Sequence, residues 1–229
     1  MTAGARMRNT AWANGLDTRH SRFRAWLDAQ IVDHAFLRVF WTNFARVDDG
    51  VWRANQPSPA TVRAWAGRGI RTVVNLRGEI QGGAYALEAD ACRRAGLTLI
   101  NHRMVSRAPP TVEQVLGLKA IFETAERPLV FHCKSGADRS GIAAALYVLM
   151  MKGGTPAQAQ SHLSLRHLHI SLSRAGALDH FIETYRDHDA TTPAPFLDWL
   201  TRDYDREAMR VEFRPFVPAE LLSRLLRRE

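Results

Sequence analysis

Cysteine is scarce in this sequence, and long apolar runs are missing from it. Only Cys92 and Cys133 occur in 229 residues, too few for a secreted disulfide framework or a tetrahedral metal site, so a reducing compartment is expected. The N-terminal stretch carries basic residues without an apolar core of signal-peptide length, and no later stretch is long enough to span a bilayer. These absences predict a soluble, cytoplasmic protein.

Acidic residues are outnumbered by basic ones, 23 to 31, which gives a formal net charge of +8. This balance favours anionic partners such as phosphorylated substrates, nucleic acid or an anionic membrane face. The arginines are spread along the chain without a nucleic-acid-binding motif, so no nucleic acid partner is expected. Hydrophobic residues make up 46% of the sequence, enough for the core of one domain with appendages.

Short β-rich runs alternate with helical patterns along the middle of the chain. The runs at 50–56, 71–78, 97–104 and 127–133 are rich in β-branched and aromatic residues and predict strands. Helix starts are indicated by Ser58-Pro59, by Thr111 with Gln114, and by Thr155-Pro156 with Gln158. After Cys133 the pattern is wholly helical. We therefore predict an α/β fold with a central, mostly parallel sheet flanked by helices.

The two ends of the chain are interpreted as helical additions. We predict an N-terminal helical extension over 1–42, the α/β domain over 43–186 and a C-terminal helical appendage over 187–229, with the polar, proline-containing stretch 187–196 as a linker. Residues 21–47 mix aromatic and aliphatic residues with arginines. That composition is typical of an interfacial amphipathic helix, or of a helix packed on the core with arginine stems lying along it. We favour the packed helix and keep a peripheral membrane contact as the alternative.

The stretch VFHCKSGADRSG, residues 130–141, joins a predicted strand to a predicted helix. Backbone N–H groups converge between the carboxyl end of a strand and a helix N-terminus, so this turn favours an anion. Gly136 and Gly141 allow the backbone to curl tightly and to approach a ligand closely. The turn is therefore predicted to bind a phosphate, through the backbone of Lys134, Ser135, Gly136 and Ala137 and the side chain of Arg139.

The residues of this turn suggest a reaction as well as a binding site. The local field favours the thiolate of Cys133, which is a nucleophile for a bound phosphorus atom. Arg139 lies far enough round the turn to bring a planar fork of donors over the anion, which a lysine does not supply. Ser140 is placed to donate a hydrogen bond to the sulfur as it leaves. His132 is expected to fix the turn through hydrogen bonds to the backbone.

His-Cys-x5-Arg-Ser resembles the signature of the cysteine-dependent phosphatase superfamily, which holds protein tyrosine phosphatases, dual-specificity phosphatases and related lipid phosphatases. The segments NFARVDDGVWRANQPSP and TVVNLRGE resemble the first strands of bacterial dual-specificity-like members, and the resemblance covers residues 43–186. It implies hydrolysis of phosphate monoesters through a phosphocysteine intermediate, with no metal or organic cofactor. We call residues 133–139 the signature loop.

One part of the family pattern is missing. Members usually carry a general-acid aspartate on a mobile loop before the cysteine, and the corresponding segment here, NHRMVSRAPPT, has no carboxylate. Asp138 is the substitute that we predict. Myotubularin-type phosphatases resemble this chain in having an aspartate at that place, and a nearby dianion favours the protonated carboxyl. The alternative is that Asp138 orients Arg139 or caps the following helix.

Other residues are given supporting roles. Lys134 is predicted to bind a second phosphate or acidic group of the substrate, the alternative being a solvated surface lysine. Asn75, Arg77 and Glu79 follow a predicted strand and are expected to buttress the signature loop.

The remaining histidines and the second cysteine suggest no further chemistry. His162, His167 and His169 have no cysteine or carboxylate partner nearby in the sequence, so no metal site is predicted. Cys92 is expected to be a buried structural thiol, and a reversible disulfide with Cys133 is the alternative.

The sequence thus predicts a phosphatase of the protein tyrosine or dual-specificity type, acting on a phosphorylated protein. A lipid or phosphoinositide phosphatase of the same superfamily is the first alternative, favoured by Lys134, Asp138, the positive charge and the N-terminal segment. The second is an inactive phosphate-binding module, favoured by the missing acid.

Overall fold

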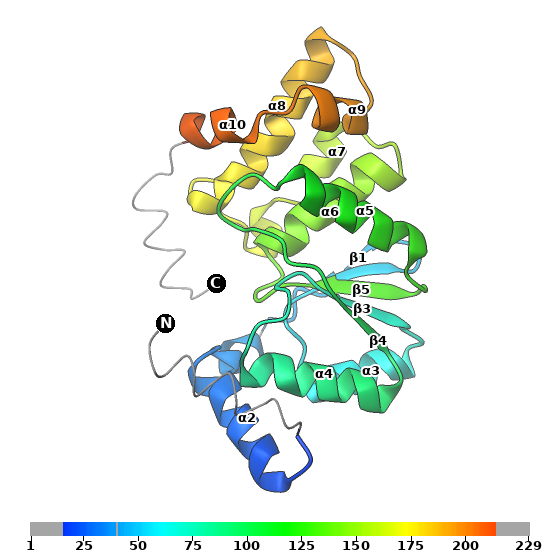
Figure 1. Ribbon diagram of the computed structural model, residues 1–229, viewed down its shortest axis with the longest axis vertical. Coiled ribbons are helices and arrows are strands. Elements are labelled where there is room, and N and C mark those ends of the chain that lie inside the picture. Colours follow the sequence, from blue (N-terminus) through cyan, green and yellow to red (C-terminus); the bar gives the residue numbers. More distant parts are fainter. Residues whose placement is uncertain (1–15, 40, 214–229) are drawn as a thin grey trace.

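The computed structural model describes residues 16–39 and 41–213 of the chain. Its centre is a five-stranded sheet in the order β1-β2-β5-β3-β4, in which only the β1–β2 pair is antiparallel (Figure 1). The strands are β1 (Ala45–Asp48), β2 (Val51–Ala54), β3 (Thr72–Asn75), β4 (Thr98–Asn101) and β5 (Leu129–His132). The predicted mostly parallel sheet, with strands in all four predicted runs, is confirmed.

β1 is a strand that the four predicted runs do not include, because the first of them begins at residue 50. Asp49 and Gly50 form the turn between β1 and β2, and Gly50 has a φ of +69°. An Asp-Gly pair between two short strands is a typical hairpin turn, because its glycine adopts positive φ without a steric penalty. The hairpin places β1 at the edge of the sheet, and β2 lies between β1 and the central strand β5.

The register of the parallel strands defines one functional edge. In β5, His132 lies opposite Ala54 of β2 and Asn75 of β3. The carboxyl ends of these three strands therefore meet at the same edge, which is where ligands bind in open α/β sheets. Cys133 is the next residue after β5, so the fold places the nucleophile at this edge.

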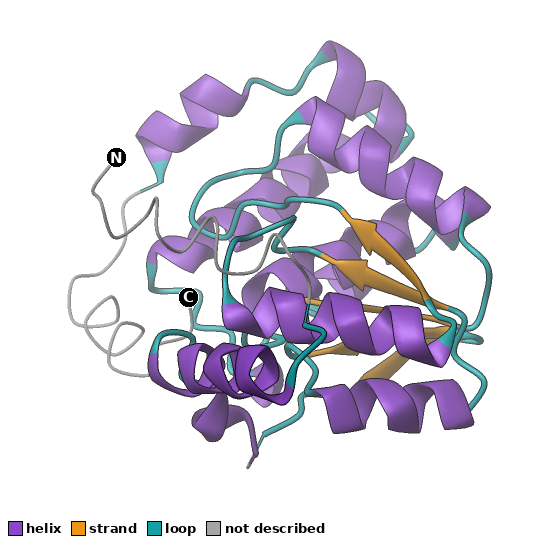
Figure 2. Cartoon of the chain, turned by 60° about the horizontal axis from the view of Figure 1, so that its bottom comes forward, coloured by secondary structure: helices purple, strands orange, loops and turns teal. Residues whose placement is uncertain are grey.

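Helices cover both faces of the sheet. On one face lie α3 (Pro59–Gly67) and α4 (Gly83–Ala95), and on the other α5 (Val112–Thr124) and α6 (Asp138–Met151), as Figures 1 and 2 show. The predicted helix starts are confirmed at Ser58, Thr111 and Thr155, each of which caps the helix that follows it. Beyond α6 come α7 (Pro156–Gln160), α8 (Ala177–Thr191), α9 (Phe196–Arg202), α10 (Arg206–Glu212) and the short turns η2 (Leu165–His167) and η3 (Arg174–Gly176).

The N-terminal segment forms α2 (Arg19–Ile31) and the turn η1 (Ala35–Val39), and α2 packs on α4. Ala25 and Ala29 face the contact, and a Cβ on Gly83 of α4 would lie 2.0 Å from the carbonyl oxygen of Ala25. The predicted helix packed on the core is confirmed. The small residues of this helix make its contact with α4. Several large apolar side chains of the segment stay exposed: Phe23, Trp26, Ile31, Val32, Phe36, Leu37 and Trp41.

The C-terminal part of the described chain is continuous with the core. α8 extends to Thr191, so residues 187–191 are helical and the linker predicted at 187–196 is wrong in that part. Phe196, Trp199 and Leu200 of α9 are buried in the same hydrophobic cluster as α6. The predicted boundary at 187 therefore lies inside a helix. Within the described residues, none of the helices is long and apolar enough to cross a membrane.

Candidate active site

The signature loop connects β5 to α6, as predicted, and Cys133 lies at its start with 2% of its surface exposed. Gly136 has a φ of +75°, and a Cβ there would lie 2.7 Å from Cβ of Asn43 and 2.9 Å from the backbone of Ala54. Glycine is required at this position on both counts, because a side chain would be strained and would have no space. The loop is thus pressed against the end of β2.

Successive carbonyl groups of the loop are held from outside it. The carbonyl oxygen of Lys134 accepts from the backbone N–H of Gln56 at 3.2 Å, and that of Ser135 accepts from the side-chain amide of Asn43 at 3.3 Å. The next two carbonyls, those of Gly136 and Ala137, accept from Arg53 Nη2 at 2.8 and 3.1 Å. In a trans peptide the N–H points opposite to the C=O. Fixing four carbonyls therefore turns the N–H groups of residues 135–138 away from these partners, which is the arrangement that binds an anion. The Ala137 N–H also donates to the Ser135 hydroxyl, within the loop, at 3.4 Å.

Arg53 is the functional residue that the sequence analysis missed. It lies on β2 with 0% of its surface exposed, and its Nη1 also donates to the carbonyl of His162 at 2.9 Å. Burial lowers the pKa of Arg53 to about 10, although the charges of Cys133 and Asp138 act in the opposite direction. The group therefore stays a cation beneath the loop. Its place in the strand VWRA gives no local signal of this role, because an arginine in a short strand can equally face solvent.

Arg139 lies at the start of α6, one residue after the last of these amides. Its Nε is buried and has no hydrogen-bond partner among the residues that the structure describes. A guanidinium N–H left in this way at the end of the signature loop is suited to an oxyanion ligand. This geometry agrees with the predicted role of Arg139.

The structure supports the predicted role of His132 and leaves that of Ser140 as a prediction. The Ser140 hydroxyl donates to the carbonyl of Ala54 at 3.2 Å, so its predicted donation to sulfur stays a prediction. The His132 ring is fully buried, with Nδ1 3.3 Å from the carbonyl oxygen of Cys133 and Nε2 2.5 Å from Glu88 Oε1. These contacts are those expected of a residue that fixes the loop.

Arg77 links the N-terminal segment to this support. Its guanidinium pairs with both oxygens of Asp33, at 2.6 and 3.0 Å, and donates to Gln56 Oε1 at 2.8 Å. Gln56 in turn donates to Glu88 at 2.6 Å. Asp33, which follows α2, is thus connected through the side chains of Arg77 and Gln56 to Glu88, which contacts His132.

Lys134 and Arg38 complete a cluster of charges around Asp33. Arg38 Nη1 lies 2.7 Å from Asp33 Oδ2 and Lys134 Nζ lies 4.0 Å from Asp33 Oδ1. The pKa of Asp33 is below its usual value, because the hydrogen bond and charge of Arg77 and the charges of Arg38 and Lys134 together outweigh burial, which acts to raise it. Lys134 is buried rather than solvated, which excludes the surface-lysine alternative.

Asn75 supports the neighbouring turn rather than the signature loop itself. Its side-chain amide donates to the carbonyl of Gly78 at 2.9 Å, and its Oδ1 accepts from the Arg77 backbone at 2.9 Å. Glu79 is exposed. Asn75 therefore supports the signature loop only indirectly, through its contact with Arg77.

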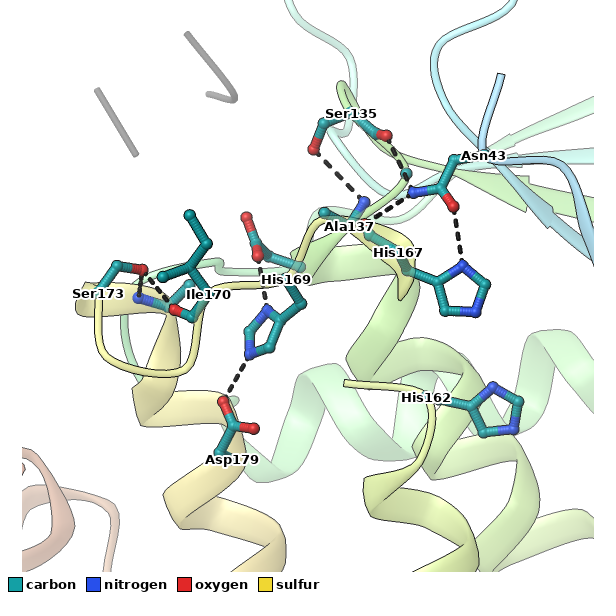
Figure 3. Close-up of polar contacts among 12 residues, drawn as sticks. Asn43, Ser135, Ala137, His162, His167, His169, Ile170, Ser173 and Asp179 are labelled. Carbon is teal, nitrogen blue, oxygen red and sulfur yellow. Dashed lines mark hydrogen bonds and ion pairs between the residues drawn. The ribbon is translucent and has the colours of Figure 1, made fainter. Parts of the chain in front are cut away.

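Asp138 points to a histidine that the sequence analysis left without a partner. His169 Nδ1 lies 2.7 Å from Asp138 Oδ1, and His169 Nε2 lies 2.5 Å from Asp179 Oδ2 on α8 (Figure 3). The statement that His169 lacks a carboxylate partner is therefore wrong, because α8 and the loop converge only in three dimensions. Burial acts to lower the pKa of His169, but its hydrogen bonds to Asp138 and Asp179 outweigh burial and raise it to about 9.

The other two histidines have separate surroundings. His167 Nδ1 lies 2.8 Å from Asn43 Oδ1, and Asn43 donates to the carbonyl of His167 at 3.0 Å (Figure 3). The η2 turn therefore fixes Asn43, which in turn binds the signature loop. Burial and the charge of Arg53 lower the pKa values of His162 and His167 to about 4. Both are therefore neutral at physiological pH.

The two cysteines are free thiols in the structure. Cys92 lies on α4 in the hydrophobic cluster that includes Ile70 and Leu97, whereas Cys133 belongs to the cluster that includes α6. Burial, with a smaller contribution from Glu88, raises the pKa of Cys92 to about 12. These observations favour the buried structural thiol over the redox disulfide.

Comparison with known proteins agrees with this geometry. The family model PTP-NADK, described as a DSP-PTPase phosphatase fused to NAD+ kinase, matches residues 43–178. The structure of TpbA from P. aeruginosa is similar at 16% identity with a TM-score of 0.53, covering 74% of this chain and 89% of that one. The core catalytic domain of the PP-IP phosphatase SIW14 from S. cerevisiae, solved with citrate, has 20% identity and a TM-score of 0.52, covering 70% and 96%. A search of curated proteins gave no match.

Proposed function

The chain belongs to the PTP-NADK family of DSP-PTPase phosphatases and is a cysteine-dependent phosphatase, and on this premise we propose that it hydrolyses phosphate monoesters through a phosphocysteine intermediate. Cys133 Sγ attacks phosphorus, the bond from phosphorus to the ester oxygen breaks, and the leaving oxygen takes up a proton from solvent. Water then attacks the phosphocysteine, which releases inorganic phosphate and restores the thiolate.

One observation carries this proposal: the carbonyl groups of residues 134–137 are all held from outside the loop that follows Cys133, and the buried Nε of Arg139 has no hydrogen-bond partner among the described residues. The backbone N–H side of the loop and this guanidinium are thus available to an oxyanion. Preorganised donors of this kind stabilise the charge that builds up on the transferring phosphoryl group. Arg53 adds a buried positive charge on the far side of the loop. No contact of Arg53 with substrate is needed for this effect.

The test is phosphate release from an aryl phosphate between about pH 5 and 8. Wild type is expected to turn over, Cys133→Ser to be inactive, and Arg139→Lys to lose about 100-fold or more in kcat because it removes the bidentate grip. Rapid quenching and mass spectrometry should find a phosphate adduct on Cys133. If wild type releases no more phosphate than Cys133→Ser but still binds vanadate, the protein is an inactive phosphate-binding module.

We propose a phosphorylated protein side chain as the first substrate class. A variant of TpbA, which shares this fold, was solved in complex with phosphotyrosine. Peptides carrying phosphotyrosine, phosphoserine or phosphothreonine are the matching assay, with the aryl phosphate as reference. A kcat/KM for phosphotyrosine peptide below that for the free aryl phosphate would count against this class.

The exposed apolar side chains of the N-terminal segment favour a lipid phosphate as the second candidate. Phe23 and Trp26 are about half exposed and stack on each other beside the exposed Arg19 and Arg24. Aromatic and basic side chains on one helix fit an anionic lipid surface. Lys134 and Arg38 add positive charge at the signature loop.

Vesicle sedimentation tests this candidate. Binding to vesicles of phosphatidylglycerol, but not of phosphatidylcholine, is expected to weaken in Trp26→Ser and to stay unchanged in Val211→Ser, which removes an exposed apolar residue from α10. Equal sedimentation of wild type and Trp26→Ser would exclude a membrane role for this face.

A further inference from the structure

Three buried side chains form a bridge from the signature loop to α8. His169 lies between Asp138 of the loop and Asp179 of α8, at 2.7 and 2.5 Å, and the side chains of the three are 0%, 4% and 8% exposed. Gln160 of α7 donates to the second oxygen of Asp179 at 2.7 Å. Figure 3 shows the His169 ring directed at Asp179, close to the backbone that carries Ala137. We call these three residues the carboxylate–histidine bridge.

We propose that His169 is a positioning residue of the phosphatase site, which as an imidazolium fixes Asp138 as a carboxylate and holds the loop's junction with α6 in place. This inference rests on the proposed function and decides between the two roles left open for Asp138. A carboxylate that pairs with an imidazolium is a poor proton donor. Asp138 then serves the loop's geometry rather than the leaving group.

Geometry explains why this contact matters to the reaction. Asp138 is the first residue of α6 and is followed at once by Arg139, so the contact of its side chain with His169 fixes the backbone that carries Arg139. Arg53 holds the carbonyl side of the same turn and interacts with Asp138 through its charge. Displacing such a support by a fraction of an ångström lowers the rate of an enzyme steeply.

Charges around His169 come from each element that faces it. Asp138 lies at the start of α6 and Asp179 on α8, while Arg53 of β2 lies behind Asp138 and the neutral Gln160 behind Asp179. His162 and His167 belong to the same segment as His169 and have lowered pKa values. Two carboxylates against one imidazole favour its protonated form.

The test compares His169→Gln, which keeps a hydrogen-bonding side chain without the charge, with Asp138→Asn. Each is expected to lower kcat for an aryl and for an alkyl phosphate by the same factor, about tenfold or more, and the double variant should be no worse than either single one. His180→Gln on α8, whose partner is Glu212 at 3.4 Å, is the matched control and should retain wild-type kcat.

The pH profile adds a readout that loss of packing alone does not move. In wild type, kcat/KM should fall as the pH rises through about 9, where His169 loses its proton, and this alkaline limb should be missing in His169→Gln. Asp179→Asn removes the far end of the bridge without changing the loop, and it should shift the limb to lower pH. It serves as the second variant if His169→Gln does not fold.

Two results overturn the proposal. In the first, Asp138→Asn loses far more activity on the alkyl than on the aryl phosphate while His169→Gln is unaffected, which makes Asp138 the general acid. In the second, His169→Gln keeps wild-type kcat and wild-type affinity for vanadate. Vanadate affinity and its pH dependence also test the bridge if the wild-type protein shows no turnover, so failure of the proposed function is distinguishable.

Discussion

A buried arginine such as Arg53 is costly to place, because taking a guanidinium out of water carries a penalty of several kcal/mol. Its hydrogen bonds to the carbonyls of Gly136, Ala137 and His162 offset that penalty. The same bonds orient the loop amides. One residue on β2 therefore sets both the charge below the loop and the direction of its N–H groups.

Arg53→Met is expected to reduce kcat/KM for an aryl phosphate by about 100-fold or more, since the carbonyls of Gly136 and Ala137 lose their donor. Leaving these buried carbonyls unpaired should also lower the free energy of unfolding by about 1–3 kcal/mol. Steady-state kinetics and urea unfolding measure the two effects. Arg63→Met on α3, an exposed arginine, is the control. Equal kinetics in both variants would contradict the role given to Arg53.

The site was predictable where its chemistry lies in one continuous segment. Cys133, Arg139 and the loop glycines occupy neighbouring positions, so their spacing alone indicated an anion site and a nucleophile. Arg53, Asn43, Asp33 and Asp179 contact the same region from distant parts of the chain. Nothing local marks which of 31 basic residues is buried, because burial depends on how the elements pack.

At the scale of elements, α2 and α4 approach each other unusually closely. Gly83 leaves room for the Ala25 carbonyl, and its N–H donates to Asp28 Oδ2 of α2 at 2.6 Å. The Asp28 carboxylate thus lies at the N-terminus of α4, where negative charge is favoured. A small residue and one acidic residue fix the angle at which the N-terminal helix leaves the domain.

Gly83→Ala should push α2 away from α4, because the new Cβ would lie 2.0 Å from a backbone oxygen that has no rotamer to change. We expect a loss of about 1–3 kcal/mol in the free energy of unfolding. Gly67→Ala is the control: a Cβ at Gly67 meets nothing within 4 Å, so this helical substitution should be neutral or slightly stabilising. Thermal melts of both variants would decide, and equal melting temperatures would rule out a tight helix contact.

Element predictions held where a local signal was strong and failed where tertiary contacts decide. Capping residues at Thr111 and Thr155 act within one turn, so their helices were predictable. The polar run at the end of α8 predicts a linker, but the helix continues through it because its apolar face is stabilised by Phe181 and Tyr185. β1 is missing from the predicted strands because its four residues carry only two apolar side chains.

At the scale of the whole molecule, buried histidines make stability depend on pH in two directions. The pKa of His169 is raised to about 9, so its contribution is fully present below its ordinary value of 6.5 and is lost as the pH rises through 9. His162 and His167 have pKa values lowered to about 4, so they destabilise the fold as the pH falls below 6.5 toward 4. Stability from these groups is therefore greatest near neutral pH.

Urea unfolding from about pH 5 to 9.5 checks this balance. Between pH 6.5 and 9 the wild type should lose about 3 kcal/mol, which is the difference in proton affinity of His169 between the folded and unfolded chain. His169→Gln should be less stable at neutral pH and nearly flat over the same range. A wild-type curve that is itself flat above neutral pH would mean that His169 is not held as a cation.

The pair between Asp33 and Arg77 decides where the chain can be shortened. In the full chain the Arg77 side chain is 9% exposed and paired with Asp33. A fragment starting at residue 43, where the family similarity begins, would lose the carboxylate that neutralises this arginine. It would also lose Asp28 from the start of α4. The smallest piece fit for expression and crystal growth therefore starts ahead of α2 and includes a segment that the family similarity does not cover.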